Sequence, residues 1–195
     1  MEDSGQFRQT LLKAQDDGAN ALRMGRLEEA LDRLFLFAGL ADKVDGAVHA
    51  VPVQGAVLAM VEPIGVIGIL CPEARPLAGL VGLVAPAIAM GNRVVVVPSQ
   101  AHPLAATDFY QVLDTSDLPG GVVNIVTGPA QELGQVLALH AGVDALWYGP
   151  QADAAALERA SAGNLKRVWA VRALGPRDIL REATQIKNVW VPYGE

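Results

Sequence analysis

The sequence Glu62-Pro-Ile-Gly-Val-Ile-Gly-Ile-Leu-Cys-Pro72 opens the stretch that decides the fold, which continues to Gly149. Within this stretch, apolar and β-branched runs alternate with longer runs of helical character, and the apolar runs are Val66–Cys71, Val94–Val97 and Val122–Thr127. Short buried strands that alternate with helices are typical of a parallel sheet covered by helices on both faces. The sequence therefore predicts an α/β fold with a doubly wound parallel sheet.

Two more strands and four helices complete this pattern. The further strands are expected at 145–148 and 167–171, and the helices at 76–90, 103–113, 130–139 and 151–162. A proline follows each of the first two strands, at Pro72 and Pro98, where the chain should turn toward its helix. The predicted sheet thus has five strands.

The segment before the sheet, residues 1–46, is predicted to be helical. Residues 1–25 show only a partial apolar stripe, so we expect them to form a loosely attached helix. A clearer stripe, with apolar residues three and four positions apart, indicates a helix with one buried face. Its members are Leu27, Ala30, Leu31, Leu34, Phe35, Ala38 and Ala41. Gly46 is expected to end this helix.

Antiparallel strands are expected outside the parallel sheet. Residues 48–53 and 56–62 are short extended runs, and Gln54-Gly55 between them suits a hairpin turn. Near the C-terminus, residues 185–192 alternate between polar and apolar with a period of two. Such alternation predicts a half-buried strand.

The composition limits the functions that the chain can have. Its 195 residues are 51% hydrophobic and 18% charged, which is typical of a folded globular protein. A net charge of −6 disfavours nucleic acid and anionic membranes as partners, and the longest apolar run, Leu77–Met90, is too short to cross a bilayer. Because the chain has one cysteine and an acidic, polar start, we expect a cytoplasmic protein. The three histidines, His49, His102 and His140, fall on different predicted elements, so no metal site is expected.

Four phrases of the sequence carry a resemblance to a known family: Glu62–Gly68, Leu83–Asn92, Leu118–Gly128 and Gly163–Val168. They closely resemble the cofactor-binding half of the aldehyde dehydrogenase superfamily, and the resemblance runs from about Arg26 to Arg172. It implies a degenerate Rossmann-like domain at 63–172. It also implies a small antiparallel oligomerisation sheet, built from residues 47–62 and 185–195. Residues 173–184 then form a short connection in the place of the family's catalytic domain.

The resemblance also implies that the catalytic groups of the family have no counterpart here. Ala74 stands at the position of the oxyanion-binding asparagine, Val171 stands at that of the general-base glutamate, and the segment with the nucleophilic cysteine is absent. Cys71 is expected to be a small buried hydrophobe. A modestly reactive thiol is the alternative, because the cationic Arg75 is near in the sequence. We therefore predict no catalytic residues and an inactive chain.

Cofactor contacts of the family are only partly kept. Its Lys-Pro-(Ala/Ser)-Glu phrase, which binds the adenosine ribose, here reads Val97-Pro98-Ser99-Gln100. Gly149 retains a glycine of the pyrophosphate loop, but Pro150 after it lacks an N–H donor. The residual contacts are thus Pro98, Ser99, Gln100 and Gly149. No cofactor is expected, and weak NAD binding stays open.

These observations favour a non-catalytic pseudoenzyme module with a scaffold or oligomerisation role. It is most similar to the shortened C-terminal region of family-16 aldehyde dehydrogenases. The expected partner is another chain of this fold or a second copy, bound through the apolar strand residues Ile186, Val189, Trp190 and Val191. The alternatives are an NAD-dependent aldehyde dehydrogenase or a subunit of one, and a partial gene product without a function of its own.

Overall fold

The computed structural model describes residues 20–52, 54–172 and 175–193. Along the chain the elements are α2 (Asn20–Leu40), β1 (Ala47–His49), β2 (Gly55–Pro63), β3 (Val66–Leu70), α3 (Pro76–Ala89), β4 (Arg93–Val97), α4 (Leu104–Asp114), β5 (Val123–Ile125), α5 (Ala130–Leu139), β6 (Ala145–Tyr148), α6 (Ala154–Ser161), a 3₁₀ turn η1 (Ala162–Asn164), β7 (Arg167–Ala170), α7 (Pro176–Glu182) and β8 (Thr184–Pro192). The predicted N-terminal helix at 1–25 lies outside the described part of the chain up to residue 19.

A five-stranded parallel sheet forms the body of the molecule. Its strand order is β5-β4-β3-β6-β7, and every neighbouring pair is parallel. From β3 the chain adds β4 and then β5 on one side, and it afterwards returns to add β6 and β7 on the other side. The direction of winding therefore reverses between β3 and β6. This sheet, together with the small antiparallel sheet described below, confirms the predicted fold class.

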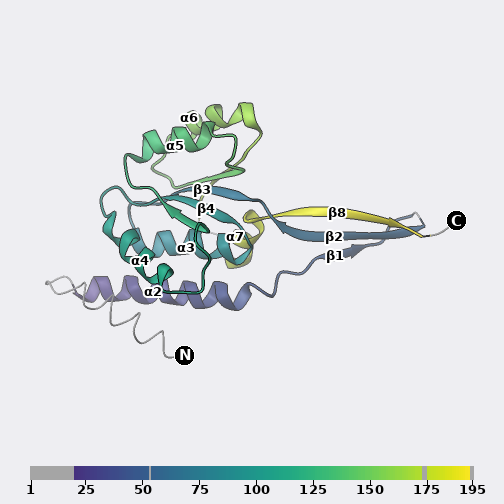
Figure 1. Cartoon of the computed structure of the whole chain (residues 1–195), viewed down its shortest axis with the longest axis horizontal. Helices are drawn as coiled ribbons and strands as arrows, with labels where there is room; N and C mark the ends of the chain where they lie inside the picture. Colours follow the sequence, from purple (N-terminus) through teal and green to yellow (C-terminus); the bar gives the residue numbers. More distant parts are fainter. Residues whose placement is uncertain (1–19, 53, 173–174, 194–195) are drawn as a thin grey trace.

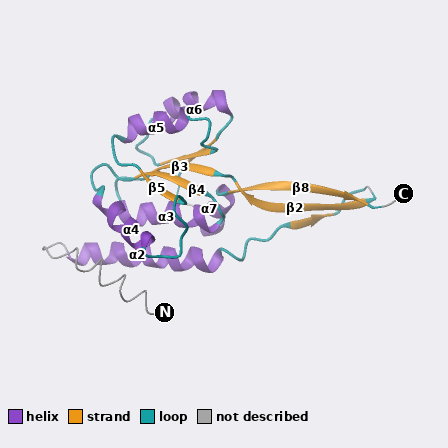
Figure 2. Cartoon of the chain, in the orientation of Figure 1, coloured by secondary structure: helices purple, strands orange, loops and turns teal. Residues whose placement is uncertain are grey.

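Helices cover both faces of this sheet (Figures 1 and 2). One face carries α5 and α6, which contact each other, and the other carries α3, with α2, α4 and α7 around it. Ten consecutive residues of α3, Ala78–Ala87, are buried because this helix lies between the sheet and α2. Burial on both sides explains why its sequence is apolar all round.

Two clusters of apolar side chains hold the layers together. The larger cluster lies on the α3 face and includes Ile67, Leu80 and Trp147. The smaller cluster lies on the α5–α6 face and includes Leu70 and Leu157. Neighbouring residues of β3 alternate between the two clusters, as the pleat of a strand buried on both faces requires.

A second, antiparallel sheet extends from one end of the body as a narrow arm (Figure 1). Strand β2 is central in the order β1-β2-β8, and it pairs with β8 over nine residues, from Gly55 with Pro192 to Pro63 with Thr184. Its pairing with β1 is shorter and covers only Ala47–His49. Of the predicted first hairpin strand at 48–53, residues 48–49 are strand, residues 50–52 are loop, and residue 53 lies outside the described part.

Two expectations about α2 were wrong. Helix α2 ends at Leu40, before Gly46, which lies beside the carbonyl of Ala59 in β2. The buried side of α2 includes Phe37, whereas Phe35 and Ala38 are exposed. Within the segment expected as a short connection, 173–184, lies α7, which packs on α3 and leads into β8. Residues 173–174 lie outside the described part.

Candidate functional site

The carboxyl ends of β3, β4 and β6 meet at one edge of the parallel sheet, where ligands of such sheets commonly bind. Three loops follow these ends, at 71–75, 98–103 and 149–153. They contain every predicted cofactor contact as well as Ala74. The reversal of winding between β3 and β6 falls at the same edge, so the topology places the candidate site here.

Glu73 connects the first two of these loops. Its carboxylate accepts hydrogen bonds from the hydroxyl of Ser99, from the backbone N–H of Gln100 at 2.9 Å and from that of Ala101 at 3.2 Å. The Ser99 hydroxyl in turn accepts the N–H of His102 at 3.1 Å. Of the predicted contacts in this loop, Pro98 and Ser99 are buried and Gln100 is exposed. The polar groups at the end of β4 thus bind a side chain of the protein itself.

The surroundings of Glu73 favour its ionised form. Burial is the largest single influence, and it acts to raise the pKa of the carboxyl group. The hydrogen bonds from Ser99, Gln100 and Ala101, together with the charge of His102, outweigh it, so the pKa lies below its ordinary value. Glu73 is therefore a carboxylate at neutral pH.

The loop after β6 contacts the end of β3 directly. The Gln151 amide donates from Nε2 to the carbonyl of Cys71 at 2.8 Å, which joins the two strands on either side of the winding reversal. Gly149 is buried, and a Cβ added there would collide with the Gln151 carboxamide. Asp153 caps α6 by accepting the N–H of Ala156 at 3.1 Å. The predicted contact Gly149 therefore leaves room for a side chain of the same loop.

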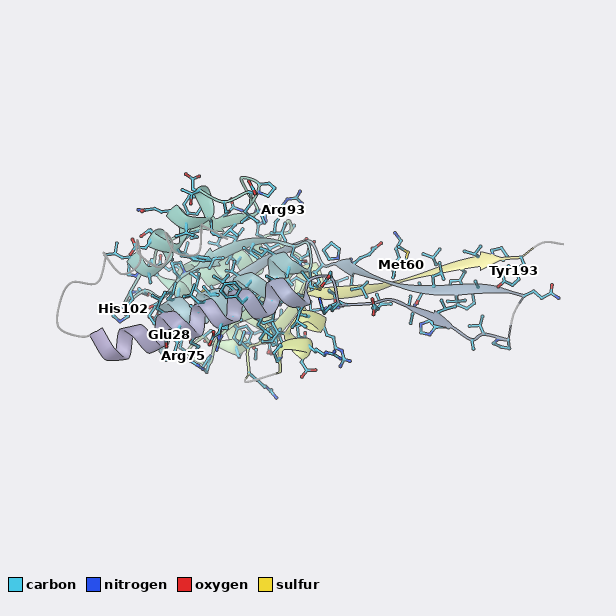
Figure 3. All side chains as sticks on the ribbon, turned by 90° about the horizontal axis from the view of Figure 1, so that it is seen from below. Glu28, Met60, Arg75, Arg93, His102 and Tyr193 are labelled. Atoms are coloured by element: carbon cyan, nitrogen blue, oxygen red, sulfur yellow. The ribbon has the colours of Figure 1, made fainter. Side chains whose placement is uncertain are left out.

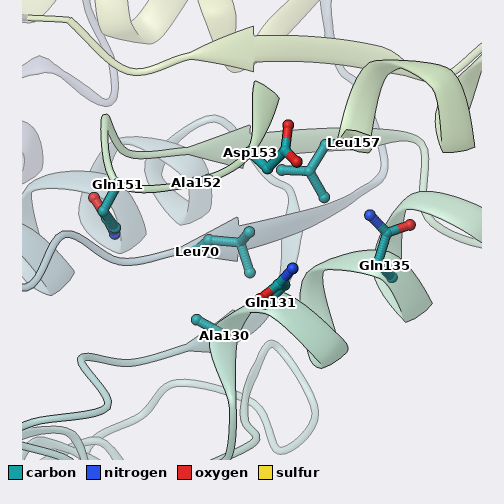
Figure 4. A pocket seen from close by; sticks show the side chains of 8 residues that line it. All are labelled: Leu70, Ala130, Gln131, Gln135, Gln151, Ala152, Asp153 and Leu157. Atoms are coloured by element: carbon teal, nitrogen blue, oxygen red, sulfur yellow. The ribbon is translucent and has the colours of Figure 1, made fainter. Parts of the chain in front are cut away.

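A cavity of about 170 Å³ lies beside this loop, between the first turns of α5 and α6 (Figure 4). Leu70 and Leu157 give it apolar walls. Polar groups come from Gln131 and Gln135 of α5 and from Gln151 and Asp153 before α6. Apolar walls with a few amide groups suit a flat, hydrogen-bonding group such as a nucleobase.

The positions that the family resemblance assigns to catalytic groups, Ala74 and Val171, carry side chains that cannot transfer a proton. Ala74 is exposed in the turn between β3 and α3, and it ends in a methyl group. Val171 is half-buried just after β7, and its N–H donates to the carbonyl of Tyr148 at 2.8 Å. Cys71 is buried, and desolvation, with a smaller effect of the Glu73 charge, raises the pKa of its thiol to about 12. At neutral pH this thiol is protonated.

The predicted interface residues lie on both faces of the arm. The register pairs Trp190 with Val57 and Ile186 with Val61, which places Ile186 and Trp190 on one face and Val189 and Val191 on the other. Except for Thr184 and Val189, the residues of β8 are exposed. The expectation of a half-buried strand was therefore wrong, because both faces of β8 meet solvent in the described part of the chain.

Sequence reasoning did not identify Glu73, Gln151 or the cavity. It examined the corner after β3 only for the family's asparagine, so Ala74 drew attention and the neighbouring Glu73 did not. A carboxylate beside a Pro-flanked corner was the available signal for Glu73. The partners of Gln151 come from the strand pairing and have no local signal. Among the described residues, no group of three His, Cys, Asp or Glu side chains is placed to hold a metal ion.

Comparisons with a family model and with individual known proteins agree on one family. Residues 6–171 match the aldehyde dehydrogenase family. The chain is 34% identical to betaine aldehyde dehydrogenase of Bacillus subtilis over 134 residues, and 35% identical to retinal dehydrogenase 2 of Mus musculus over 146 residues. These matches cover 68% and 73% of the chain, but only 27% and 28% of the relatives. The chain thus spans little more than a quarter of their length.

Solved structures of the family share the fold. An aldehyde dehydrogenase described as putative, from Burkholderia cenocepacia, has a TM-score of 0.71 at 36% identity, over 74% of this chain and 30% of that chain. Betaine aldehyde dehydrogenase of Staphylococcus aureus, solved in complex with NAD⁺, has a TM-score of 0.68 at 26% identity, over 75% and 30%. None of the helices in the described part of this chain has the length and apolar character to span a membrane. On these matches of sequence and fold, the chain belongs to the aldehyde dehydrogenase family.

Proposed function

We propose that this chain is a non-catalytic module of the aldehyde dehydrogenase fold that associates through its arm with a second copy or with another chain of this fold. The observation that carries the proposal is the arm itself. It extends from the body as a three-stranded sheet, and large apolar side chains are exposed on both of its faces (Figure 3).

The exposed apolar surface of the arm supports association. Trp190 and Ile186 on one face are 61% and 57% exposed, and Val48 on the other face is 73% exposed. Met60 and Tyr193 add to this surface (Figure 3). Large apolar side chains gathered on an exposed element in this way are typical of an interaction site. Within the described residues, β8 pairs only with β2, so its other edge can accept a further strand.

The non-catalytic part of the proposal rests on the side chains at the sheet edge. Ala74 and Val171 carry no group for oxyanion binding or proton transfer, and the Cys71 thiol is buried and protonated. We further propose that the chain corresponds to the shortened C-terminal region of family-16 members. The short path from β7 through α7 to β8, in the place where the family resemblance puts a catalytic domain, supports this assignment.

Association is tested by light scattering on the full chain after size-exclusion chromatography. We expect a dimer or larger assembly for the natural sequence, and a monomer for the double variant Ile186→Asp/Trp190→Asp, because two charges would stand on one apolar face of the arm. The control is Val136→Asp, which places a charge on an exposed apolar position of α5 and should leave the assembly intact. A natural chain that is monomeric and captures no chain of this fold would contradict the proposal.

A second candidate function is a subunit of an NAD-dependent aldehyde dehydrogenase. The cavity between α5 and α6 favours it, because its apolar walls and amide groups suit the adenine end of a dinucleotide. Isothermal titration with NAD separates the two functions. Binding in the micromolar range supports the enzyme subunit, and no binding at millimolar NAD supports the non-catalytic module.

A further inference from the structure

A complete set of hydrogen-bond donors surrounds the carboxylate of Glu73 at the end of β4. One carboxylate oxygen accepts the Gln100 N–H, and the other accepts both the Ser99 hydroxyl and the Ala101 N–H. The donor loop is firmly built, because Ser99 is fully buried and its hydroxyl is itself held by the His102 N–H.

This donor set has the chemistry of an anion site. Successive backbone N–H groups that converge on one point, together with a hydroxyl, bind carboxylates and phosphates by charge-assisted hydrogen bonds. The Ser99 oxygen accepts the N–H of His102, and its hydroxyl proton is directed at the Glu73 carboxylate. If Glu73 pointed elsewhere, these three donors would lose the carboxylate and be left to solvent or to another acceptor.

We propose that Ser99, Gln100 and Ala101 form an anion-binding site whose ligand in this chain is its own Glu73. An external phosphate or carboxylate enters only when the Glu73 carboxylate leaves, since both would need the same three donors. The charge of Glu73 also repels any second anion at this edge of the sheet.

This inference deepens the proposed function, on which it rests, because it gives a physical reason for the lack of cofactor chemistry. The residues at the end of β4 do not fit a bound dinucleotide while Glu73 lies among them. The cavity between α5 and α6 is separate from this donor set and does not include Glu73. The internal carboxylate thus closes one part of the edge and leaves that cavity open.

The test is an acetate titration of the full-length, ¹⁵N-labelled chain, followed by NMR at constant ionic strength with chloride as the balancing ion. In the variant Glu73→Ala, we expect the amide signals of Gln100 and Ala101 to shift saturably with acetate. The natural chain should show no such shift. Asp45→Ala is the control, because it removes one exposed carboxylate from the link between α2 and β1 and should behave like the natural chain.

Two results would overturn the inference: no saturable shift in Glu73→Ala, or equal shifts in the natural chain. If Glu73→Ala does not fold, Glu73→Gln replaces it, because the amide keeps the shape and loses the charge. Hydrogen exchange at Gln100 and Ala101 should then be about tenfold faster than in the natural chain, since charge-assisted bonds are lost. Unchanged exchange would overturn the inference.

The outcome is independent of the test of the proposed function. Micromolar binding of NAD by the natural chain would contradict the non-catalytic module. A Glu73→Ala chain that ignores acetate, while the natural chain still assembles and binds no NAD, would contradict only the anion site.

Discussion

Asn92 joins several segments of the fold that are far apart in the sequence. It is buried, and its amide oxygen accepts the N–H groups of Ile64 and Gly65 at 2.8 and 3.0 Å. Its amide nitrogen donates to the carbonyls of Ala87 and Ala183 at 2.9 and 2.8 Å. The junction of β2 with β3, the last turn of α3 and the end of α7 are therefore held by one residue, with all of its hydrogen-bonding capacity used.

Substitution of Asn92 by aspartate should destabilise the chain strongly. The carboxylate can accept the two N–H groups, but it cannot donate to the carbonyls of Ala87 and Ala183, and it adds a buried charge. We expect a loss of about 3 kcal/mol in the free energy of unfolding, measured by urea denaturation. The control Asn188→Asp changes an exposed residue of the arm and should cost little. Similar losses in both variants would contradict this account.

Glu73 should make stability depend on pH in a specific direction. Its folded-state pKa is lowered, so the stability that its bonds contribute is fully present above the unfolded-state pKa and is lost as the pH falls through the folded-state pKa. The difference in unfolding free energy between the natural chain and Glu73→Gln should be largest at neutral pH and shrink below the ordinary carboxyl value of 4.5. A difference that is constant from pH 7 to pH 3 would show that the carboxylate charge is not involved.

At the scale of elements, the periodicity of the sequence predicted which helices and strands exist better than it predicted which side of a helix is buried. The bounds of β4, α5 and β6 agree with the sequence pattern, because long apolar runs and regular spacing leave little ambiguity. The buried side of α2 was predicted less well. It is set by contact with α3, where Arg33 lies over Gly82 and donates to the carbonyl of Ala78 at 3.1 Å. Such tertiary contacts have no local signal.

The short helix α7 was missed for a related reason. Its seven residues are too few for a periodic stripe, and the only buried residue within them is Leu180. Pro176 at its first turn and Asp178 after it were helix-start signals of the ordinary kind. The family resemblance implied only a short connection at 173–184 and indicated nothing about its secondary structure.

The link between η1 and β7 contains a strained residue. Leu165 is the one non-glycine residue with a positive φ among the described residues, at 56°, and its side chain is almost fully exposed. The variant Leu165→Gly should raise the unfolding free energy by about 0.5 kcal/mol, because relief of the left-handed strain exceeds the entropy cost of glycine. Leu165→Ala keeps the Cβ and should bring no gain. Thermal unfolding of both variants checks this, and a loss of stability in Leu165→Gly would refute it.

At the scale of the whole molecule, the sequence predicted the edge of the sheet where the candidate site lies, but not how that edge is filled. Pro98, Ser99, Gln100 and Gly149 follow strands β4 and β6, whose carboxyl ends meet with that of β3. That Glu73 reaches across to the loop at 99–101 depends on the side-by-side placement of β3 and β4 and on the shape of both loops. Neither can be read from one segment alone.

The body of the molecule should fold without the last strand. The two buried apolar clusters are formed by the parallel sheet and the helices on its faces, whereas β8 contributes few buried residues. A chain that ends after Thr184 should keep a cooperative unfolding transition and native-like circular dichroism, and it should lose self-association. Analytical ultracentrifugation and thermal melts test both parts. A truncated chain that is unfolded would show that the arm is needed for folding itself.

Only Ile64 and Gly65 separate β2 from β3, and the N–H groups of both residues are bound by Asn92. The arm consequently cannot rotate freely about its base, in contrast to a domain on a glycine-rich linker, whose orientation is random. A partner bound to the arm would therefore hold the parallel sheet in one fixed orientation. The direction in which the cavity and the Glu73 loop face would then be set by where the partner binds.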